Sequence, residues 1–405
     1  MTLPKQLTDI LDFLRGEDWI QALNSIGDTY MVGGCVRDAF RGQKIKDIDL
    51  IVDGTSMEAI LEELRPYGRV DQVGESFAVI KFRPKGHTGE DYDIAVPRID
   101  RKIGVGHKGF VVETEGVDIF SDLQRRDFTI NAIAVKVDSG TLVDPYNGLH
   151  DIKVQFLKAV DPRAFVDDPL RILRGIQFAS RFGYEISPGT MKLMRENAHL
   201  IKEISGERIF EELMKVLDKN GDTQLALDLL HQTDVDVALF DKKMLKYDQG
   251  FEHLDPTSFF YVLGLLGDVN PADFLKKRLR GDNRLEKNVR VLDRIFEMLP
   301  RMVEDEDLKY MLSKAFTAAP EVMDAVILPD EVDEIVLQMR TMKIPMNEGD
   351  IKIGGEDIKR IGQLKEGPEI GFIKEKILRD ALMNRFNWKD RDKSLEYLQN
   401  LLYSK

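Results

Sequence analysis

The stretch Met31–Asp53, MVGGCVRDAFRGQKIKDIDLIVD, decides how the rest of the chain is interpreted. An apolar strand is expected to run into the adjacent glycines Gly33 and Gly34, and a helix is expected to follow over 35–42. A second strand is expected over Ile48–Val52. The order of strand, glycine turn, helix and strand predicts an α/β unit whose first turn can approach a ligand closely.

Asp47 and Asp49 are separated by one residue at the start of this second strand. Side chains two positions apart on a strand point to the same face, so the sequence predicts two adjacent carboxylates. Such carboxylates repel each other unless a cation lies between them. Mg²⁺ is the expected cation, because it is usually held by one or two carboxylates together with substrate phosphates. For the pair taken alone, the alternative is a strand end with two solvated aspartates.

The motif GGCVRD, Gly33–Asp38, has the features of a phosphate site. A helix that begins after the glycines would present free N–H groups to an anion. Arg37 adds a planar guanidinium suited to phosphate. The alternative is an ordinary tight turn. A phosphate site followed by a carboxylate pair is the combination that nucleotidyl transfer requires, and it favours binding of a nucleoside triphosphate.

The motif RRDFTINAIAV, Arg125–Val135, places Arg125, Arg126 and Asp127 in front of an apolar run. For the motif taken alone, one interpretation is a helix start with solvated charges, in which Asn131 forms only a local hydrogen bond.

The motif VDDPLRILRGIQFASRFGYEI, Val166–Ile186, predicts a helix, because Pro169 suits the first turn of one. Asp168, Arg171 and Arg174 follow at intervals of three and are expected to share one helix face. An acceptor and a donor held at this spacing could read the edge of a nucleobase. The alternative is an exposed salt bridge, worth about 0.3–0.5 kcal/mol.

The composition limits the class of protein. The chain has 405 residues, which is enough for two to four domains, and its net charge is −13. Cys35 is the single cysteine, so no intrachain disulfide can form. With neither a signal-peptide core nor an apolar run of membrane-spanning length in the sequence, we expect a soluble cytoplasmic protein. From about Asp161 onward the pattern is helical, with helices expected over 169–182, 188–197, 206–218, 222–232, 256–267 and 284–297.

The stretch FLKKRLRGDNRLEKNVR, Phe274–Arg290, is strongly basic within this acidic chain. Phosphate contacts need local rather than global positive charge. The candidate RNA-binding residues are Lys276, Lys277, Arg278 and Arg280. The alternative is a solvated helix face.

Taken together, the motifs resemble those of the class II tRNA nucleotidyltransferases, the CCA-adding enzymes of the bacterial and eukaryotic type, in the poly(A) polymerase superfamily. DPYNGLHDI (Asp144–Ile152) and GERIFEELMKVL (Gly206–Leu217) resemble two further motifs of this family, and the match covers roughly residues 28–218. The stretch Ile353–Leu382 resembles the tail domain of the shorter bacterial members.

The resemblance implies an α+β fold with a DNA polymerase β-like nucleotidyltransferase head around a small mixed sheet, followed by helical domains. The implied boundaries are a catalytic head over 1–150, a neck that recognises the base over 151–220, a body over 221–330 and a tRNA-binding tail over 331–405. The implied activity adds CCA to the 3′ end of tRNA from CTP and ATP, with Mg²⁺ and release of pyrophosphate. The resemblance implies no membrane partner, and no obligate protein partner is evident.

The resemblance also assigns roles to residues. Asp47 and Asp49 would be catalytic and bind Mg²⁺, and Asp93 is a further candidate ligand. Asp168 and Arg171 would pair with the base of CTP or ATP. The nucleotide would also be held by Gly33, Gly34, Arg37, Arg126, Asp127 and Arg174.

Some features depart from the family pattern or leave alternatives open. Asp167 stands where the family usually has Glu, and Gln177 stands where it often has Arg. The glycine-rich stretch 98–110 resembles the flexible loop that the family needs for the final A, which favours complete CCA addition. The alternatives are a poly(A) polymerase, a CC- or A-adding relative, or a catalytically silent RNA-binding protein, against which the Asp47–Asp49 pair argues.

Overall fold

The computed structural model describes residues 2–73, 79–102, 110–246, 251, 253–298, 305–318, 335–337, 339–340, 344–345 and 347–403. The chain forms two compact units, Met1–Lys243 and Met244–Lys405. Each unit is described separately below. The finer division into head, neck, body and tail stays a prediction. Within the described ranges, no helix combines the length and apolarity needed to cross a membrane.

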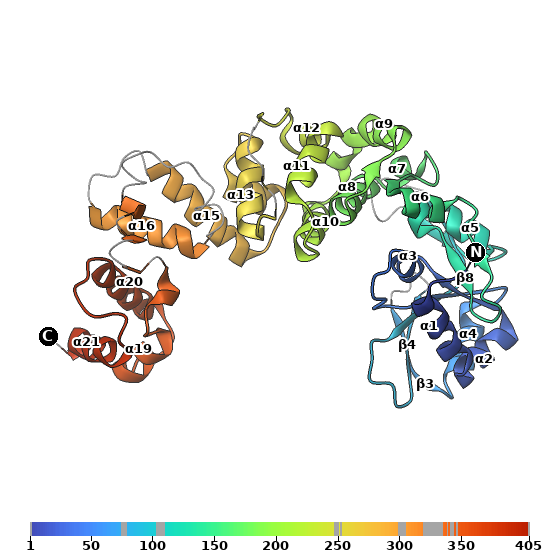
Figure 1. The fold of residues 1–405 in the computed structure, drawn as a ribbon, viewed down its shortest axis with the longest axis horizontal. Helices are drawn as coiled ribbons and strands as arrows, with labels where there is room; N and C mark the ends of the chain where they lie inside the picture. The colour runs from blue at the N-terminus through green and yellow to red at the C-terminus, as the bar shows by residue number, and fades with distance from the viewer. Residues whose placement is uncertain are drawn as a thin grey trace. The chain divides into compact units, whose positions relative to one another are not determined.

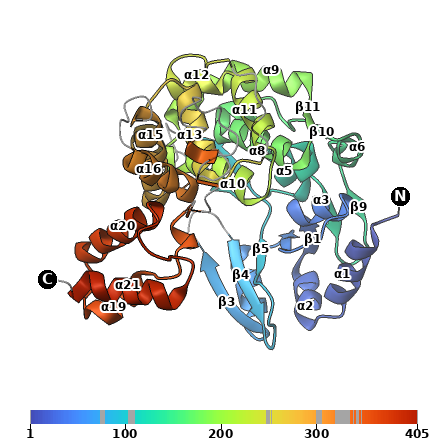
Figure 2. The same ribbon diagram turned by 60° about the vertical axis from the view of Figure 1, so that its left-hand side comes forward.

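The N-terminal part of the first unit is built on a seven-stranded mixed sheet in the order β3-β4-β5-β2-β1-β8-β9. The strands are β1 Asp28–Val32, β2 Asp49–Asp53, β3 Gly68–Val73, β4 Val79–Pro84, β5 Tyr92–Ala95, β8 Ala134–Lys136 and β9 Leu142–Val143. β2 and β5 run parallel, and the other neighbouring pairs run antiparallel. Figure 2 shows β3 and β4 as a long hairpin, followed by β5 and β1. The predicted small mixed sheet is confirmed.

Short helices pack against this sheet and against each other. They are α1 Lys5–Arg15, α2 Asp18–Ile26, α3 Gly34–Phe40, α4 Met57–Leu64 and α5 Ile119–Gln124. The spacing of Leu7, Leu11 and Leu14 places three apolar side chains on one face of α1, and all three are buried. Tyr30 and Ile51 from paired strands join one apolar cluster with α5. This packing fixes the ends of β1 and β2, where the candidate site residues lie.

Two predicted boundaries were wrong. The second strand begins at Asp49 rather than Ile48, so Asp47 lies before the strand and not on it. The ends of the predicted loop 98–110 form two antiparallel strands, β6 Ile99–Lys102 and β7 Phe110–Glu113. Residues 103–109 lie outside the described residues.

The second half of the first unit is almost entirely helical. Its helices are α6 Gly148–Val154, α7 Ala164–Asp167, α8 Leu170–Phe182, α9 Pro188–Asn197, α10 Gly206–Asp218, α11 Thr223–Gln232 and α12 Val235–Phe240, with the 3₁₀ turns η2 Thr129–Asn131 and η3 Ala198–Glu203. The strands β10 Phe156–Leu157 and β11 Glu185–Ile186 form a short parallel pair. Helix α8 packs against α10 and α11 (Figure 1). The helices predicted over 169–182, 188–197, 206–218 and 222–232 are confirmed.

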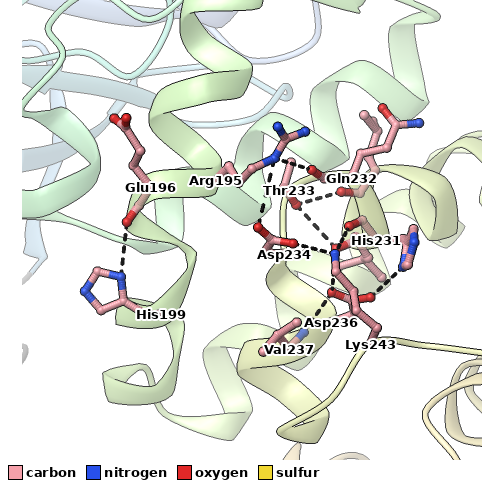
Figure 3. Close-up of polar contacts among 12 residues, drawn as sticks. Arg195, Glu196, His199, His231, Gln232, Thr233, Asp234, Asp236, Val237 and Lys243 are labelled. Atoms are coloured by element: carbon pink, nitrogen blue, oxygen red, sulfur yellow. Dashed lines mark hydrogen bonds and ion pairs between the residues drawn. The ribbon is translucent and has the colours of Figure 1, made fainter.

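A cluster of polar side chains lies where α11 ends and α12 begins (Figure 3). The Asp236 side chain is fully buried and accepts a hydrogen bond from His231 Nδ1 at 2.7 Å. Lys243 donates to the His231 carbonyl at 2.6 Å, and Arg195 donates to the Gln232 carbonyl at 3.0 Å. These cations satisfy carbonyl groups that the end of α11 leaves without helical partners, so the cluster has a structural role.

The described residues of the second unit lie mainly in helices. These are α13 Pro256–Leu266, α14 Pro271–Asp273, the π-helical turn η4 Phe274–Arg278, α15 Asn283–Met298, α16 Asp305–Ala318, the 3₁₀ turn η6 Glu348–Asp350, α19 Gly355–Gly362, α20 Pro368–Leu382 and α21 Arg391–Tyr403. The last three lie together (Figure 1) around buried Ile358, Ile377 and Leu398. The helices predicted over 256–267 and 284–297 are confirmed, as is the overall α+β class.

Candidate functional site

The glycine turn joins β1 to α3. Gly33 has φ +68°, in the left-handed region that favours glycine, and its N–H donates to the Ile133 carbonyl at 3.1 Å. A Cβ atom at this position would lie 2.5 Å from Nη1 of Arg126. The turn therefore brings the backbone of one predicted motif against the guanidinium of another. Cys35, next along the chain, is buried, which raises the pKa of its thiol to about 12 and makes it a poor nucleophile.

The carboxylates lie at one end of the central strands. Asp49 is the first residue of β2 and pairs in register with Asp93 of β5, which in turn pairs with Lys81 of β4. Lys81 Nζ lies 3.0 Å from Asp93 Oδ1. Burial raises the pKa of Asp49, and the charges of Asp93 and Asp47 raise it further, while Arg126 lowers it. The predicted crowding of negative charge at Asp47 and Asp49 is therefore present, and Asp93 contributes to it.

Glu90 is a fourth carboxyl group at this edge, and the sequence interpretation missed it. Glu90 shares a hydrogen bond with Asp47, and this bond is the main reason that the pKa of Glu90 is raised. The acidic run of Glu90, Asp91 and Asp93 just before and inside β5 was the available signal. The sequence analysis selected only Asp93 from this run.

Arg126 lies between the carboxylate edge and the glycine turn. Its Nε and Nη2 donate to Oδ2 of Asp122 at 3.2 and 3.0 Å. Asp122 is fully buried in α5 and also accepts from Arg125. Arg126, two residues after the end of α5, is thus held by Asp122, a residue inside α5 that the sequence interpretation did not select.

Arg37 is 7% exposed, and each of its side-chain nitrogens has a partner. Nε and Nη2 donate to the two oxygens of Asp38, both at 2.9 Å, and Nη1 donates to Asn131 at 2.6 Å. Its guanidinium lies 5.4 and 5.0 Å from the ring centres of Phe178 and Phe182. In this arrangement three of the five N–H donors of Arg37 bind other side chains of the protein, so Arg37 supports the residues around the glycine turn.

Asp127 connects the glycine turn to helix α8. The side chain of Asn131 donates to Asp127 Oδ1 at 2.8 Å, and Arg174 Nη2 lies 2.7 Å from Asp127 Oδ2. Burial would raise the pKa of Asp127, but the charge of Arg174 and the hydrogen bond from Asn131 outweigh burial and lower it. Asn131 bonds Asp127 and Arg37 at once, so it is more than the local hydrogen bonder considered as the alternative.

Asp168 and Arg171 do not lie on one helix as predicted. Asp168 follows α7 with an extended backbone, and α8 begins at Leu170. Pro169 explains the difference, because the residue before a proline is disfavoured in the helical region. The Asp168 side chain accepts from the Leu170 N–H at 3.3 Å and lies 3.8 Å from Arg208. Both Asp168 and Arg171 are half-buried and retain exposed surface at the start of α8.

The basic stretch belongs to the second unit, and its charges are partly paired locally. Lys277 lies 2.9 Å from Asp273, and Lys276 lies 3.8 Å from Glu286. Both lysines are exposed, Arg280 is exposed, and Arg278 is half-buried. The π-helical turn of 274–278 therefore presents its lysines to solvent. The exposed pair of Lys277 with Asp273 is weak, and Lys276 lies near the buried Glu286.

Two parts of the chain match known protein families. Residues 29–158 match the family described as the poly(A) polymerase head domain. Residues 183–241 match the family described as a probable RNA and SrmB-binding site of polymerase A. The first match contains the carboxylate edge, the glycine turn and the Arg126–Asp127 pair. The second lies in the helices that follow α8.

Two relatives are named multifunctional CCA proteins. The protein of Stenotrophomonas maltophilia strain K279a is 45% identical over 194 residues, which is 46% of this chain and 45% of that protein. The protein of Xanthomonas oryzae pv. oryzae strain MAFF 311018 is 42% identical over 214 residues, which is 51% of this chain and 48% of that protein. The match thus spans about half the length of these relatives.

Solved structures match nearly the whole chain. The Thermotoga maritima CCA-adding enzyme complexed with tRNA has a TM-score of 0.63 and 25% identity, covering 99% of this chain and 100% of that one. The Bacillus stearothermophilus CCA-adding enzyme in complex with CTP has a TM-score of 0.61 and 21% identity, covering 100% and 99%. Residues 29–158 therefore resemble the poly(A) polymerase head-domain family, and the chain has the fold of the CCA-adding enzymes.

Proposed function

We propose that this chain adds CCA to the 3′ end of tRNA without a nucleic-acid template, taking CMP from CTP and AMP from ATP and releasing pyrophosphate. One observation carries the proposal. Arg126 lies between Asp49 and the glycine turn, while its neighbour Asp127 is bound to Arg174 of α8. The place for phosphate chemistry and the helix proposed to read the base are therefore joined by direct contacts. The names of the relatives and of the solved structures support this assignment.

The donor set at the carboxylate edge fits Mg²⁺. Asp47 and Asp49 offer hard oxygen ligands, and their mutual repulsion favours a bound cation. Among the residues that the structure describes, no three potential ligand side chains form a ready metal cage. The protein would then supply two carboxylates, with Asp93 nearby, and the triphosphate would supply further oxygens. Bound Mg²⁺ would activate the attacking 3′-hydroxyl and neutralise charge on the triphosphate and the leaving pyrophosphate.

The residues of the chain would orient the reactants. The turn at Gly33 and Gly34 lets phosphates approach the backbone, and Arg126 places positive charge beside it. Either Asp47 or Asp49 could accept the proton of the 3′-hydroxyl. Asp168 would offer an acceptor and Arg171 a donor to the base edge of CTP or ATP. Arg37, Asp127 and Arg174 would hold these groups in place through the bonds described above.

The basic stretch would contact the tRNA backbone through Lys276, Lys277, Arg278 and Arg280. Phosphate contacts of this kind fix the position of an RNA and carry no sequence information themselves. An enzyme that completes tRNA needs both tRNA and nucleoside triphosphates, so we place it in the cytoplasm.

The test uses tRNA that ends at the discriminator base, incubated with the protein and Mg²⁺. CTP alone should add two residues, ATP alone should add none, and both together should add CCA and then stop. A long A tail would instead identify a poly(A) polymerase. Addition that stops at CC, or A addition only to tRNA ending in CC, would identify a narrower relative. No incorporation under any condition would contradict the proposal and favour a silent RNA-binding protein.

A further inference from the structure

Asp122 is the most deeply buried acid near the site, and neither the sequence motifs nor the proposed chemistry uses it. It lies on α5 with no exposed surface. Burying an ionised carboxylate is costly unless it is fully paired. Such a group in contact with a site residue therefore needs an explanation beyond packing.

The two oxygens of Asp122 bind two different arginines. Oδ1 accepts from Arg125 Nε at 3.0 Å and Nη2 at 2.6 Å, and from the Arg98 N–H at 3.4 Å. Oδ2 accepts from Arg126 Nε at 3.2 Å and Nη2 at 3.0 Å. Burial would raise the pKa of Asp122, but the charges of Arg126 and Arg125 outweigh burial and lower it. Asp122 is therefore ionised at neutral pH.

The two hydrogen bonds from Arg126 Nε and Nη2 to Asp122 Oδ2, called the Arg126 fork below, determine which nitrogen of Arg126 faces the site. Two nitrogens of a planar guanidinium are held, so the plane and the direction of the third nitrogen are fixed. That third nitrogen, Nη1, lies 2.5 Å from the position of a Cβ on Gly33. The Arg126 side chain is 18% exposed, and its charge reaches Asp49. Nη1 is thus presented at the glycine turn, beside the carboxylate edge.

We infer that Asp122 is a positioning residue that aims the Arg126 guanidinium at the triphosphate of the incoming nucleotide. The inference rests on the proposed function, since it assumes that a nucleoside triphosphate binds at the glycine turn. An unheld arginine would lose side-chain entropy each time it bound a phosphate. Asp122 removes that cost in advance, because Arg126 already has one orientation before the nucleotide arrives.

Asp122→Asn tests this inference. The amide keeps the size of the side chain but removes its negative charge and leaves one acceptor oxygen for two arginines, so it cannot hold Arg125 and Arg126 together. We expect CTP to bind about 10–100-fold more weakly, as when a residue that orients a ligand group is lost. Equilibrium binding of CTP in the presence of Mg²⁺ measures this without catalysis. Asp118→Asn is the matched control, because Asp118 caps the same helix from an exposed position and asparagine caps equally well.

Chemical rescue separates aiming from a purely structural role. Arg126→Ala should regain part of its CTP affinity when millimolar guanidinium is added, since Asp122 can hold the free cation in place. The double variant Asp122→Asn, Arg126→Ala should show no rescue. Rescue that is equal in both variants would overturn the inference, because the guanidinium would then need no carboxylate behind it.

Arg126→Lys keeps the inference testable if Asp122→Asn does not fold, which thermal melting would show. A lysine keeps the charge but cannot form the fork, so it should bind CTP nearly as weakly as Arg126→Ala. Wild-type affinity in Arg126→Lys would show that aiming is unimportant. Failure of the proposed function is a separate result: the wild-type protein would then fail to extend tRNA, whatever these variants bind.

Discussion

Two carboxylates of the first unit, the half-buried Asp49 and the fully buried Asp122, differ in their surroundings, and the difference separates a chemical role from a supporting one. Asp49, at the carboxylate edge, has a raised pKa because burial and the acids Asp93 and Asp47 disfavour its charge. Asp122, on α5, has a lowered pKa because two arginines outweigh its burial. Arg126 acts on both, but it bonds to Asp122 and only influences Asp49 from nearby.

The comparison shows which group has room for a cation. Asp122 has accepted hydrogen bonds on both oxygens, so it can do little except hold its arginines. Asp49 has excess negative charge around it, which a metal ion would relieve. A carboxylate whose ionised form is disfavoured by the fold is a candidate functional residue. A carboxylate whose oxygens are all paired is a candidate for a supporting role.

The largest expected effect comes from Asp49→Asn. CMP and AMP incorporation should fall by about 10³-fold or more, about 4 kcal/mol of activation free energy, because a ligand for Mg²⁺ is lost. The free energy of unfolding at neutral pH should stay equal or rise. A raised pKa means that the fold disfavours the ionised form, and asparagine is neutral.

Single-turnover extension of tRNA and urea denaturation measure the two effects. Asp53→Asn is the matched control at the other end of β2, where the side-chain oxygen accepts from the Ile119 N–H and an amide oxygen can do the same. That variant should keep its activity. An Asp49→Asn protein that extended tRNA at the wild-type rate would remove Asp49 from the chemistry.

Asp127→Asn should show the opposite pattern, with stability as the main loss. Removing the buried carboxylate of Asp127 leaves the half-buried Arg174 without its partner, and we expect a loss of about 1–3 kcal/mol at neutral pH. The pKa of Asp127 is lowered in the fold, so its contribution is complete above the unfolded value of about 3.9. That contribution disappears as the pH falls through the lower folded value.

Urea denaturation of both proteins between neutral pH and pH 2 checks the sign. The two free energies of unfolding should differ at neutral pH and converge below about pH 4. A difference that grew as the pH fell would mean that Asp127 is protonated in the fold, against the direction given by Arg174. Asp161→Asn is the control, because the half-buried Asp161 is paired with the exposed Arg163. This variant should change the free energy of unfolding by about 1 kcal/mol or less.

The sequence was sufficient for features that depend on local order. The helices of both units followed from apolar periodicity, and the glycine turn and acid pair followed from residue type and spacing. The position of Asp168 before its helix could also have been inferred, because Pro169 directly follows it. The predicted start of this strand at Ile48 was wrong by one residue. The strand begins at Asp49, and Asp47 lies before it.

The partners of Arg37 and Arg174 could not be predicted, because they depend on which segments the fold brings together. Arg37 and Asn131 are 94 positions apart, and Asp127 and Arg174 are 47 apart. The two residues of each pair belong to two different recognised motifs, and the motifs do not say which of their side chains face one another. Asp122 was missed for a related reason, since an acid four positions before an arginine resembles an ordinary helix pair.

A smaller effect is expected from Arg171→Ala, which tests the end of the site that reads the base. If Arg171 donates to the base edge, its loss should reduce discrimination of CTP and ATP against UTP and GTP by about 1–3 kcal/mol. Competition between nucleotides in single-turnover extension measures this ratio. Arg163→Ala, an exposed arginine just before α7, should leave it unchanged. An unchanged ratio in Arg171→Ala would assign the choice of base elsewhere.

The smallest effect is expected in the basic stretch of the second unit, where charges are exposed rather than buried. Lys276→Ala with Lys277→Ala should reduce the slope of log tRNA affinity against log salt by about 1 for each lysine that contacts a phosphate. Stability should change little, because exposed ion pairs such as Lys277–Asp273 contribute about 0–1 kcal/mol. Lys5→Ala is the control, since Lys5 forms a similar exposed pair with Asp9 at the same spacing on α1. If the double variant and the control had the same salt slope as the wild type, these lysines would belong to a solvated helix face, and tRNA would have to be held by other residues.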